Sequence, residues 1–312
     1  MEFPFQILKS KEFDVVGFGT NALDYLIRVA EYPAFNSKVE LDSYVQSGGG
    51  EIASTMAGLR RLGLKTAYAG RFGDDHEGDI GLQSLVDEGV DVSLTERVAD
   101  AKTQVAFITI DRKSGERTIL WQRDELLSYD EKDAPVEIAS RCRVLHMTPH
   151  DTQACIRMAN AARTVGAIVS LDIDNVFDGV EELLPLVDIC LASSEFPEKL
   201  LGITDKKRAL QEISSRYGCA VTGLTLGDAG SLVLCGDTFI ETPAFAVPGG
   251  CVDTTGAGDA FRTGFLYGVL TGGSVEESCS AANAVAALKC RGIGARNTLP
   301  NQPELQTMLK NN

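Results

Sequence analysis

Two patterns of apolar residues alternate along the chain. Continuous apolar runs typical of buried strands occupy residues 13–19, 144–148 and 167–172. Apolar residues spaced by three and four positions follow such runs and predict helices, for example at 76–88 and 152–164. Repeated strand–helix units predict a mostly parallel sheet covered by helices on both faces. The expected fold class is therefore α/β, a three-layer sandwich around a mostly parallel sheet.

Two regions interrupt this alternation. Residues 38–46 alternate between apolar and polar side chains, as in a half-exposed strand, and residues 103–122 form two β-rich runs around a turn at 113–116. These segments predict a small sheet outside the main one. No repeat, low-complexity tract or long linker divides the chain, so a single domain over 1–312 is expected.

The first glycine motif follows a predicted strand. Gly17-x-Gly19-x-x-Ala22 matches the fingerprint of dinucleotide-binding proteins, and Glu40 lies at about the spacing of its acidic residue. Only residues 21–30 could form the helix that this motif requires, before Tyr32-Pro33 stops it. A dinucleotide-dependent oxidoreductase is therefore one alternative for the function.

A later glycine motif combines an anion site with a carboxylate. Gly256-Ala257-Gly258-Asp259 precedes apolar residues at helical spacing. The free N–H groups of a helix's first turn bind anions, and glycines let an anion approach the backbone. Asp259 would repel a phosphate there unless it has chemistry to perform, such as accepting a proton from an attacking hydroxyl. The alternative is an ordinary acidic residue that stabilises the helix N-terminus.

Composition and charge exclude several classes of protein. The 312 residues carry a formal charge of −15, which disfavours nucleic acid and anionic membranes as partners. No apolar stretch reaches membrane-spanning length, and residues 1–14 lack the pattern of a secretory signal. Eight cysteines without a C-x-x-C pair are typical of reduced thiols in a cytoplasmic protein. The sequence contains no Gly-Lys dipeptide, so a classical P-loop is absent.

Taken together, the motifs resemble those of the ribokinase-like sugar kinases, the PfkB family of carbohydrate kinases, over nearly the whole chain. The motifs that carry the resemblance are the early glycine turn with Gly49 and Gly50, Gly73-Asp74-Asp75, Thr225-Leu226-Gly227-x-x-Gly230 and Asp253-Thr254-Thr255-Gly256-Ala257-Gly258-Asp259. The resemblance implies an α/β sandwich with a small β-sheet lid, here segments of approximately 25–47 and 101–123. It also implies an ATP- and Mg²⁺-dependent kinase of a small sugar or sugar derivative.

The resemblance also implies roles for individual residues. Asp259 would be the general base, and Gly256, Ala257 and Gly258 would form the anion hole. The sugar would contact Asp24, Gly49, Gly50, Ser54 and Arg123, and the nucleotide would contact Thr225, Gly227, Gly230 and Asn283. Glu195 would be the carboxylate on the magnesium side. Asp253 and Thr255 would hold a monovalent cation such as K⁺, assisted by carbonyl groups of residues 290–294.

Three motifs depart from the family pattern. Ser54 replaces an asparagine that usually reaches a sugar hydroxyl, and Ser193-Ser194-Glu195 stands where the family usually has Asn-x-x-Glu. The usual Asp-x-Asn element reads Asp172-Ile173-Asp174-Asn175. An acidic sugar bound by Arg71 or Arg123 therefore stays open as a substrate.

Two further expectations concern association and activity. A small open sheet has edges that need covering, which favours a homodimer through the lid. A non-catalytic sugar or nucleotide sensor on the same fold remains an alternative, against which the intact Asp259 argues.

Overall fold

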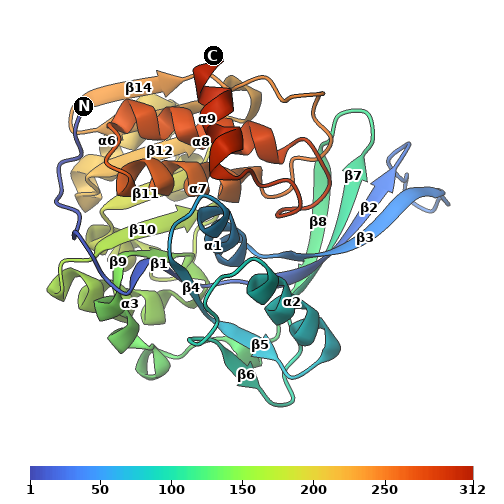
Figure 1. Cartoon of the computed structure of the whole chain (residues 1–312), viewed down its shortest axis with the longest axis horizontal. Helices are drawn as coiled ribbons and strands as arrows, with labels where there is room; N and C mark the ends of the chain where they lie inside the picture. Colours follow the sequence, from blue (N-terminus) through green and yellow to red (C-terminus); the bar gives the residue numbers. More distant parts are fainter. Residues whose placement is uncertain (312) are drawn as a thin grey trace.

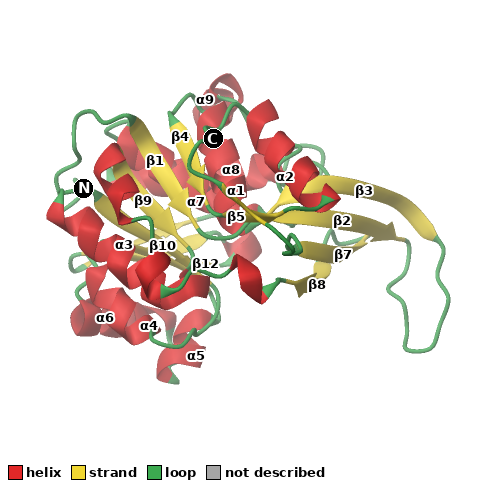
Figure 2. Cartoon of the chain, turned by 90° about the horizontal axis from the view of Figure 1, so that it is seen from below, coloured by secondary structure: helices red, strands yellow, loops and turns green. Residues whose placement is uncertain are grey.

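The computed structural model describes residues 1–311 and places a large twisted sheet between two helical layers, with a smaller sheet projecting at one side (Figures 1 and 2). The large sheet has the order β14-β13-β12-β11-β10-β9-β1-β4. Its strands are β1 (Phe13–Phe18), β4 (Thr66–Ala69), β9 (Cys142–Met147), β10 (Ile168–Ile173), β11 (Ile189–Ser193), β12 (Val221–Thr225), β13 (Ser231–Cys235) and β14 (Thr238–Thr242). The strands from β4 to β12 are mutually parallel, and β13 and β14 are antiparallel additions. The predicted fold class is confirmed.

Helices cover both faces of this sheet because each strand buries apolar residues on both sides. One face carries α3 (Thr152–Thr164), α4 (Val180–Leu183), α5 (Phe196–Leu201) and α6 (Lys206–Tyr217). The other carries α1 (Glu51–Arg61), α7 (Ala257–Leu270), α8 (Val275–Lys289) and α9 (Gln302–Lys310). Short 3₁₀ turns complete the chain at Glu125–Leu127, Glu131–Asp133, Val136–Arg141, Pro149–Asp151, Leu184–Leu186 and Gly227–Ala229.

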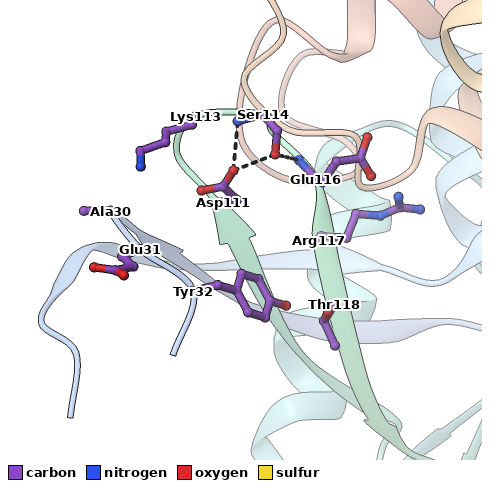
Figure 3. A pocket seen from close by; sticks show the side chains of 9 residues that line it. All are labelled: Ala30, Glu31, Tyr32, Asp111, Lys113, Ser114, Glu116, Arg117 and Thr118. Carbon is purple, nitrogen blue, oxygen red and sulfur yellow. Dashed lines mark hydrogen bonds between the residues drawn. The ribbon is translucent and has the colours of Figure 1, made fainter. Parts of the chain in front are cut away.

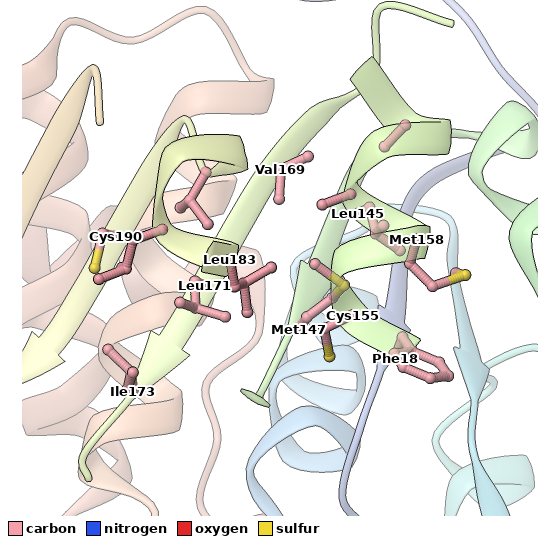
Figure 4. Packing of buried hydrophobic residues seen from close by; sticks show 14 of the residues in the cluster. Phe18, Leu145, Met147, Cys155, Met158, Val169, Leu171, Ile173, Leu183 and Cys190 are labelled. Carbon is pink, nitrogen blue, oxygen red and sulfur yellow. The ribbon is translucent and has the colours of Figure 1, made fainter. Parts of the chain in front are cut away.

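The core on the α3 face is filled by medium-sized apolar and sulfur-containing side chains (Figure 4). Met147 on β9 belongs to one buried cluster with Cys155 and Met158 of α3 and Leu183 of α4. All eight cysteines are free thiols, and all but Cys251 are buried. The expectation of reduced cysteines agrees with this arrangement, in which cysteine acts as a small apolar core residue.

The smaller sheet, called the lid below, has the order β3-β2-β7-β8. Its strands are β2 (Ala22–Val29), β3 (Leu41–Gly49), β7 (Val105–Asp111) and β8 (Arg117–Gln122). Leu26, Ala106, Ile108 and Ile110 form its own buried cluster. Helix α2 (His76–Asp87) lies beside the lid, next to a two-stranded sheet of β5 (Arg71–Gly73) and β6 (Glu96–Val98). None of the helices in residues 1–311 is both long and apolar enough to span a membrane.

The stretch at 21–30, which alone could have supplied the helix of the dinucleotide motif, contains strand β2 instead. The segment Ala22–Val29 carries aromatic and β-branched residues and pairs with both β3 and β7 along its length. Gly17 and Gly19 therefore lead from one strand into another. Because the dinucleotide fingerprint needs a helix N-terminus directly after its glycines, the oxidoreductase alternative loses its structural basis.

Candidate active site

A cavity of about 1450 Å³ lies between the carboxyl ends of the parallel strands and the inner face of the lid. Residues following β9, β10, β11 and β12 line its floor, as ligand sites do in open parallel sheets. The lid contributes Gln104, Ala106, Ile108, Ile119 and Trp121 to the opposite wall. The first turn of α7 borders the same space.

The N-terminus of α7 carries the residues for which the sequence predicts an anion site. Gly256, with φ of 74°, turns the chain into the helix, and a left-handed backbone there favours glycine. The first bond between successive helical turns runs from Ala260 N to Gly256 O at 2.9 Å, so the preceding N–H groups of Gly258 and Asp259 remain at the free end of the helix. Gly256, Ala257, Gly258 and Asp259 all line the cavity.

Asp259 is held rigidly at the start of α7. Its carbonyl oxygen accepts hydrogen bonds from Thr263 Oγ1 at 2.9 Å and Thr55 Oγ1 at 3.4 Å. Burial of its carboxyl group, together with the negative charge of Glu51, raises the pKa of Asp259 to about 7. Glu51 opens α1 and lines the same cavity. A carboxyl group with a pKa near neutrality can accept and return a proton at physiological pH.

A buried ion pair lies next to Asp259. Arg262, one helical turn further along α7, places Nη2 2.7 Å from Asp172 Oδ1 and 3.1 Å from Leu191 O. Both side chains are about 95% buried. Burial raises the pKa of Asp172 while the guanidinium group opposes that rise. Asp172 Oδ2 has no hydrogen-bond partner among residues 1–311, which leaves one carboxylate oxygen available to a ligand in the cavity.

Asp24 marks the end of the cavity nearest the lid. It is buried at the start of β2 and lines the cavity together with Gly50. Burial raises its pKa to about 7, although the charge of Arg296 acts in the opposite direction. A Cβ atom at Gly49 would fall 2.1 Å from Asp24 Oδ2, so glycine at 49 makes room for this carboxylate. The structure thus brings Asp24 and Gly50 to the cavity, with Gly49 directly behind them.

Ser54 lies behind the cavity wall and is 1% exposed. The buried Arg296 fills the space in front of it, since Arg296 Nε is 3.3 Å from Ser54 Oγ and its Nη1 is 2.9 Å from Ser84 Oγ. Arg296 Nη2 also donates to Gly49 O. Ser54 is therefore not among the cavity-lining residues, and Arg296 instead fixes the glycine turn.

Arg123 and Arg71 both form ion pairs with acidic residues outside the cavity lining. Arg123 forms two hydrogen bonds with the carboxylate of Asp151, at 3.1 and 2.8 Å, and is not among the cavity-lining residues. Arg71 pairs with Glu96 and stacks over the ring of Tyr129. The geometry therefore gives no support to either arginine as a ligand for an acidic substrate.

Aromatic side chains line the cavity on the side of the lid. Trp121 is 59% exposed, and its ring packs edge-on against His150 with centroids 6.4 Å apart. His150 in turn lies 4.9 Å from the ring of Phe177. All three residues line the cavity. Partly exposed rings of this kind offer flat apolar surfaces to a ligand.

The predicted nucleotide residues gather at the other end of the cavity. Thr225 ends β12, and Gly227 and Gly230 belong to the turn into β13. Asn283 of α8 reaches the same wall, where its Nδ2 donates to Ser231 Oγ at 2.8 Å. All four predicted residues line the cavity.

Carboxylates that could support a metal ion lie between the two ends. Glu195 follows β11, its side chain is 77% exposed, and it lines the cavity with Asp172 and Asp174. Within residues 1–311, no group of three or more His, Cys, Asp or Glu side chains forms a complete metal site. One or two carboxylates are what a magnesium ion bound to nucleotide phosphates needs from a protein, and the unpartnered Asp172 Oδ2 fits that requirement.

The predicted monovalent cation site is arranged differently. Thr255 lines the cavity, whereas Asp253 is completely buried beneath it. The ammonium group of Lys289 lies 2.7 Å from the carbonyl oxygen of Asp253 and 3.9 Å from its Oδ2. An additional cation at Asp253 would face this charge directly, so the residues present do not fit K⁺.

The hairpin between β7 and β8 connects the lid to the loop before α7. Gly115 O accepts hydrogen bonds from the N–H and the hydroxyl of Thr254, each at 3.1 Å, and Arg117 Nη1 lies 3.1 Å from Thr254 Oγ1. Figure 3 shows the hairpin beside a shallower cavity of about 400 Å³. The turn of this hairpin is held by two hydrogen bonds from Ser114 to the carboxylate of Asp111. Arg117 also lines the main cavity, so the lid brings a cation to the loop at 251–256 that leads into α7.

Comparison with known proteins agrees with this geometry. The sequence profile of the pfkB family carbohydrate kinases matches residues 14–302. A nucleoside kinase from Methanothermobacter thermautotrophicus is 26% identical over 309 residues, which cover 95% of each chain. An uncharacterized sugar kinase from Archaeoglobus fulgidus is 34% identical over 253 residues, covering 78% of this chain and 98% of that protein. The structure of Arabidopsis thaliana ribokinase complexed with ribose and ATP has a TM-score of 0.82 at 23% identity, covering 96% of this chain and 99% of that one.

A three-layer α/β fold with a β-sheet lid, and a carboxylate at a glycine-capped helix N-terminus, thus define a phosphotransferase. The chain belongs to the pfkB family of carbohydrate kinases. It is an ATP-dependent kinase of the class that acts on sugars or nucleosides.

Several residues of the site escaped sequence reasoning. Glu51 directly follows the Gly48-Gly49-Gly50 turn, and its position in the first turn of a helix could have identified it. Arg262 could have been found as the cation one turn after Asp259. No sequence motif identifies the remaining three residues, because only the fold brings them to the site. Arg117 and Lys289 reach the loop before α7, and Arg296 reaches the glycine turn.

Proposed function

We propose that this kinase transfers the terminal phosphoryl group of ATP to a hydroxyl group of a neutral sugar or sugar derivative, with Asp259 as the general base. The observation that carries the proposal is the position of Asp259, which lines the cavity in the first turn of α7 directly after Gly256, Ala257 and Gly258. Burial raises the pKa of this carboxyl group, which supports its role as a base. Asp259 accepts the hydroxyl proton while the acceptor oxygen forms its bond to phosphorus. The bond from phosphorus to the bridging oxygen breaks, and ADP leaves.

Backbone groups at the start of α7 would stabilise the charge that develops in this reaction. Gly256, Ala257 and Gly258 would form the anion hole at the positive end of the helix dipole. The Ala257 N–H donates to Thr254 O, so the free N–H groups of Gly258 and Asp259 would bind the phosphoryl oxygens. Magnesium held by the nucleotide phosphates, with Glu195 and Asp172 as the protein carboxylates, would neutralise phosphate charge. Thr225, Gly227, Gly230 and Asn283 would line the nucleotide end.

The acceptor would bind at the end of the cavity beneath the lid. Asp24 offers carboxylate oxygens to paired hydroxyl groups, and Gly50 leaves the backbone accessible beside it. Carboxylates predominate around the acceptor, since Asp24, Glu51 and Asp259 all line the cavity, whereas Arg71 and Arg123 are paired elsewhere. This charge balance favours a neutral acceptor over an acidic or phosphorylated one.

The aromatic wall of Trp121, His150 and Phe177 suits an acceptor that carries a ring beside its hydroxyl groups, such as a nucleoside or a pyranose. The nucleoside kinase of Methanothermobacter thermautotrophicus provides a precedent among the relatives for the first of these. The free thiols of all eight cysteines support a location in the reducing cytoplasm.

A screen for ADP release tests this proposal. The purified protein would be incubated with ATP, Mg²⁺ and a panel of pentoses, hexoses, nucleosides, acidic sugars and ketose phosphates. We expect turnover with a neutral acceptor, and we expect Asp259→Asn to lower that turnover by about 10²–10⁴-fold while ATP binding persists.

Trp121→Ala should raise KM for that acceptor. Full turnover by Asp259→Asn, or a clear preference for an acidic acceptor, would contradict the proposal, and acceptor binding without ADP release would indicate a sensor.

The outer face of the lid supports the expected dimer. Tyr25, Phe107 and Leu120 lie side by side on three neighbouring strands, on the face opposite the cavity-lining Ala106 and Ile108. The rings of Tyr25 and Phe107 stack with centroids 4.8 Å apart, and Leu120 is 67% exposed. We propose that two copies of the chain cover these apolar faces against each other.

A further inference from the structure

Lys289 is a lysine enclosed completely by protein. It is the last residue of α8, and neither its side chain nor that of Asp253 has exposed surface. Its Nζ donates to the carbonyl oxygen of Asp253 at 2.7 Å and lies 3.9 Å from Asp253 Oδ2. A buried ammonium group requires a compensating charge and hydrogen-bond acceptors, and Asp253 supplies both.

Asp253 ties together two loops at the edge of the cavity. Its Oδ1 accepts from Thr255 N at 2.8 Å, on the loop that leads into Gly256 and α7. Its Oδ2 accepts from Gly294 N at 2.7 Å, on the loop that follows α8. The same two loops are joined by the bond from Val252 N to Cys290 O at 2.9 Å. The position of the anion hole therefore depends on the carboxylate of Asp253.

The ammonium group occupies the place where a dissociable cation would have to bind. Such a cation would need the carbonyl oxygen of Asp253, which Lys289 already uses, together with carboxylate oxygens that each accept an N–H. It would also lie within a few ångströms of the ammonium charge. The electrostatic repulsion between the two cations would be strong, because both side chains at the site are buried away from solvent. Thr298 Oγ1 donates to the backbone oxygen of Lys289 and so fixes the end of α8.

We infer that the Lys289 ammonium group is a built-in cation that positions the anion-hole loop, so that phosphoryl transfer by this chain requires no added K⁺. The reaction itself rests on the proposed function, whereas the cation assignment rests on the contacts of Lys289. Lys289 is a positioning residue, since it acts on the reacting groups through Asp253 and Thr255. Its ammonium group takes the place of the ion expected from the resemblance to the family.

The parent protein provides the first test. ADP release would be measured in tetramethylammonium chloride and in potassium chloride at equal ionic strength. We expect kcat and KM to agree within about twofold, because the carbonyl oxygen of Asp253 is already occupied. A tenfold or larger requirement for K⁺, about 1.4 kcal/mol in the transition state, would overturn the inference.

The second test removes the positive charge of Lys289. Lys289→Met removes the ammonium group but keeps most of the apolar stem, and Lys207→Met, at an exposed lysine paired with Glu241, is the matched control. We expect Lys289→Met to lose about tenfold or more in kcat and to recover part of that loss in K⁺ or NH₄⁺, but not in tetramethylammonium. The control should respond to neither salt. A loss that no small cation restores, in a protein that remains folded, would contradict the assignment.

Thermal unfolding separates this inference from the proposed reaction. K⁺ should raise the unfolding temperature of Lys289→Met relative to tetramethylammonium, while the parent protein and Lys207→Met should show no such difference. This measurement needs no acceptor, so it remains valid even if the kinase reaction is assigned incorrectly. Stabilisation of the parent by K⁺, to the same extent as the variant, would show that the site binds a free ion.

Discussion

Asp259 has a rare combination of surroundings for a carboxyl group. It lies at the positive end of a helix, which favours its charged form, yet burial and the charge of Glu51 raise its pKa to about 7. A carboxylate of ordinary acidity would be a weaker base towards a sugar hydroxyl. The crowding of Asp24, Glu51 and Asp259 therefore makes Asp259 a stronger proton acceptor at a cost in stability.

The first prediction at this scale concerns pH. We expect kcat/KM to rise with pH and to level off above an apparent pKa near 7, because the protonated form of Asp259 cannot accept a proton. Glu51→Gln should move this midpoint to lower pH, since it removes a neighbouring negative charge. Initial rates across the acid and neutral range would measure both effects. Glu198→Gln, at an exposed site on α5, is the control, and an equal shift in that variant would refute the role of Glu51.

The second prediction concerns stability. Asp259 has a folded-state pKa near 7 and an unfolded value near 3.9, so the folded state retains a proton that the unfolded state has lost between these pH values. Its contribution to the free energy of unfolding therefore falls as pH rises through that window. Asp259→Asn should raise the thermal unfolding temperature at about pH 8 and have much less effect at about pH 4. Differential scanning calorimetry of both proteins would show whether the gain grows with pH.

At the scale of elements, the hairpin between β7 and β8 links the lid to the loop at 251–256 that leads into α7. Gly115 has φ of 74°, and a Cβ atom there would lie 3.0 Å from Cys251 Sγ and 3.2 Å from the backbone of Val252. Its carbonyl oxygen accepts two hydrogen bonds from Thr254. The tip of the lid is therefore hydrogen-bonded to Thr254, just before the predicted anion hole.

We predict that Gly115→Ala lowers kcat/KM for the acceptor by about tenfold, because it displaces the hairpin from Thr254 and misplaces reacting groups. Gly236→Ala provides a matched control, since Gly236 has φ of 55° in another hairpin and its Cβ would meet open space. Both variants carry the strain of a positive φ, but only the first should impair catalysis. Equal kinetics in the two variants would show that the hairpin contact has no catalytic role.

At the scale of the whole molecule, the lid has two different faces. One face closes the cavity with Ala106, Ile108 and Trp121, and the other exposes Phe107 and Leu120. A sheet this small cannot bury both faces within one chain, because β2, β3, β7 and β8 project from the body of the protein (Figures 1 and 2).

We predict that the protein is a dimer and that Leu120→Asp shifts it to a monomer, because a charge would be buried in the apolar contact. Light scattering coupled to gel filtration would measure the mass of each form. Leu126→Asp, at another exposed leucine outside the lid strands, should leave the dimer intact. A monomeric parent protein at micromolar concentration would rule out the lid interface.

Local patterns were enough to predict the alternation of strands and helices, the helix at 152–164 and a helix that starts at the glycines around Gly256. These features depend on local periodicity and on the backbone freedom of glycine, which a sequence expresses directly. The sequence also brought out Asp259 as a carboxylate in the first turn of that helix. Residues 22–29 could have formed a short helix by their pattern, but their pairing with β3 and β7 makes them a strand.

Other side chains of the site are brought to it by the folding of the chain in three dimensions. Arg117 reaches the loop before α7 from strand β8, and Arg296 occupies the space in front of Ser54. Lys289 reaches Asp253 from 36 positions away in the chain. Charges act through space and are strengthened by burial, and neither distance nor burial can be read from spacing along a sequence.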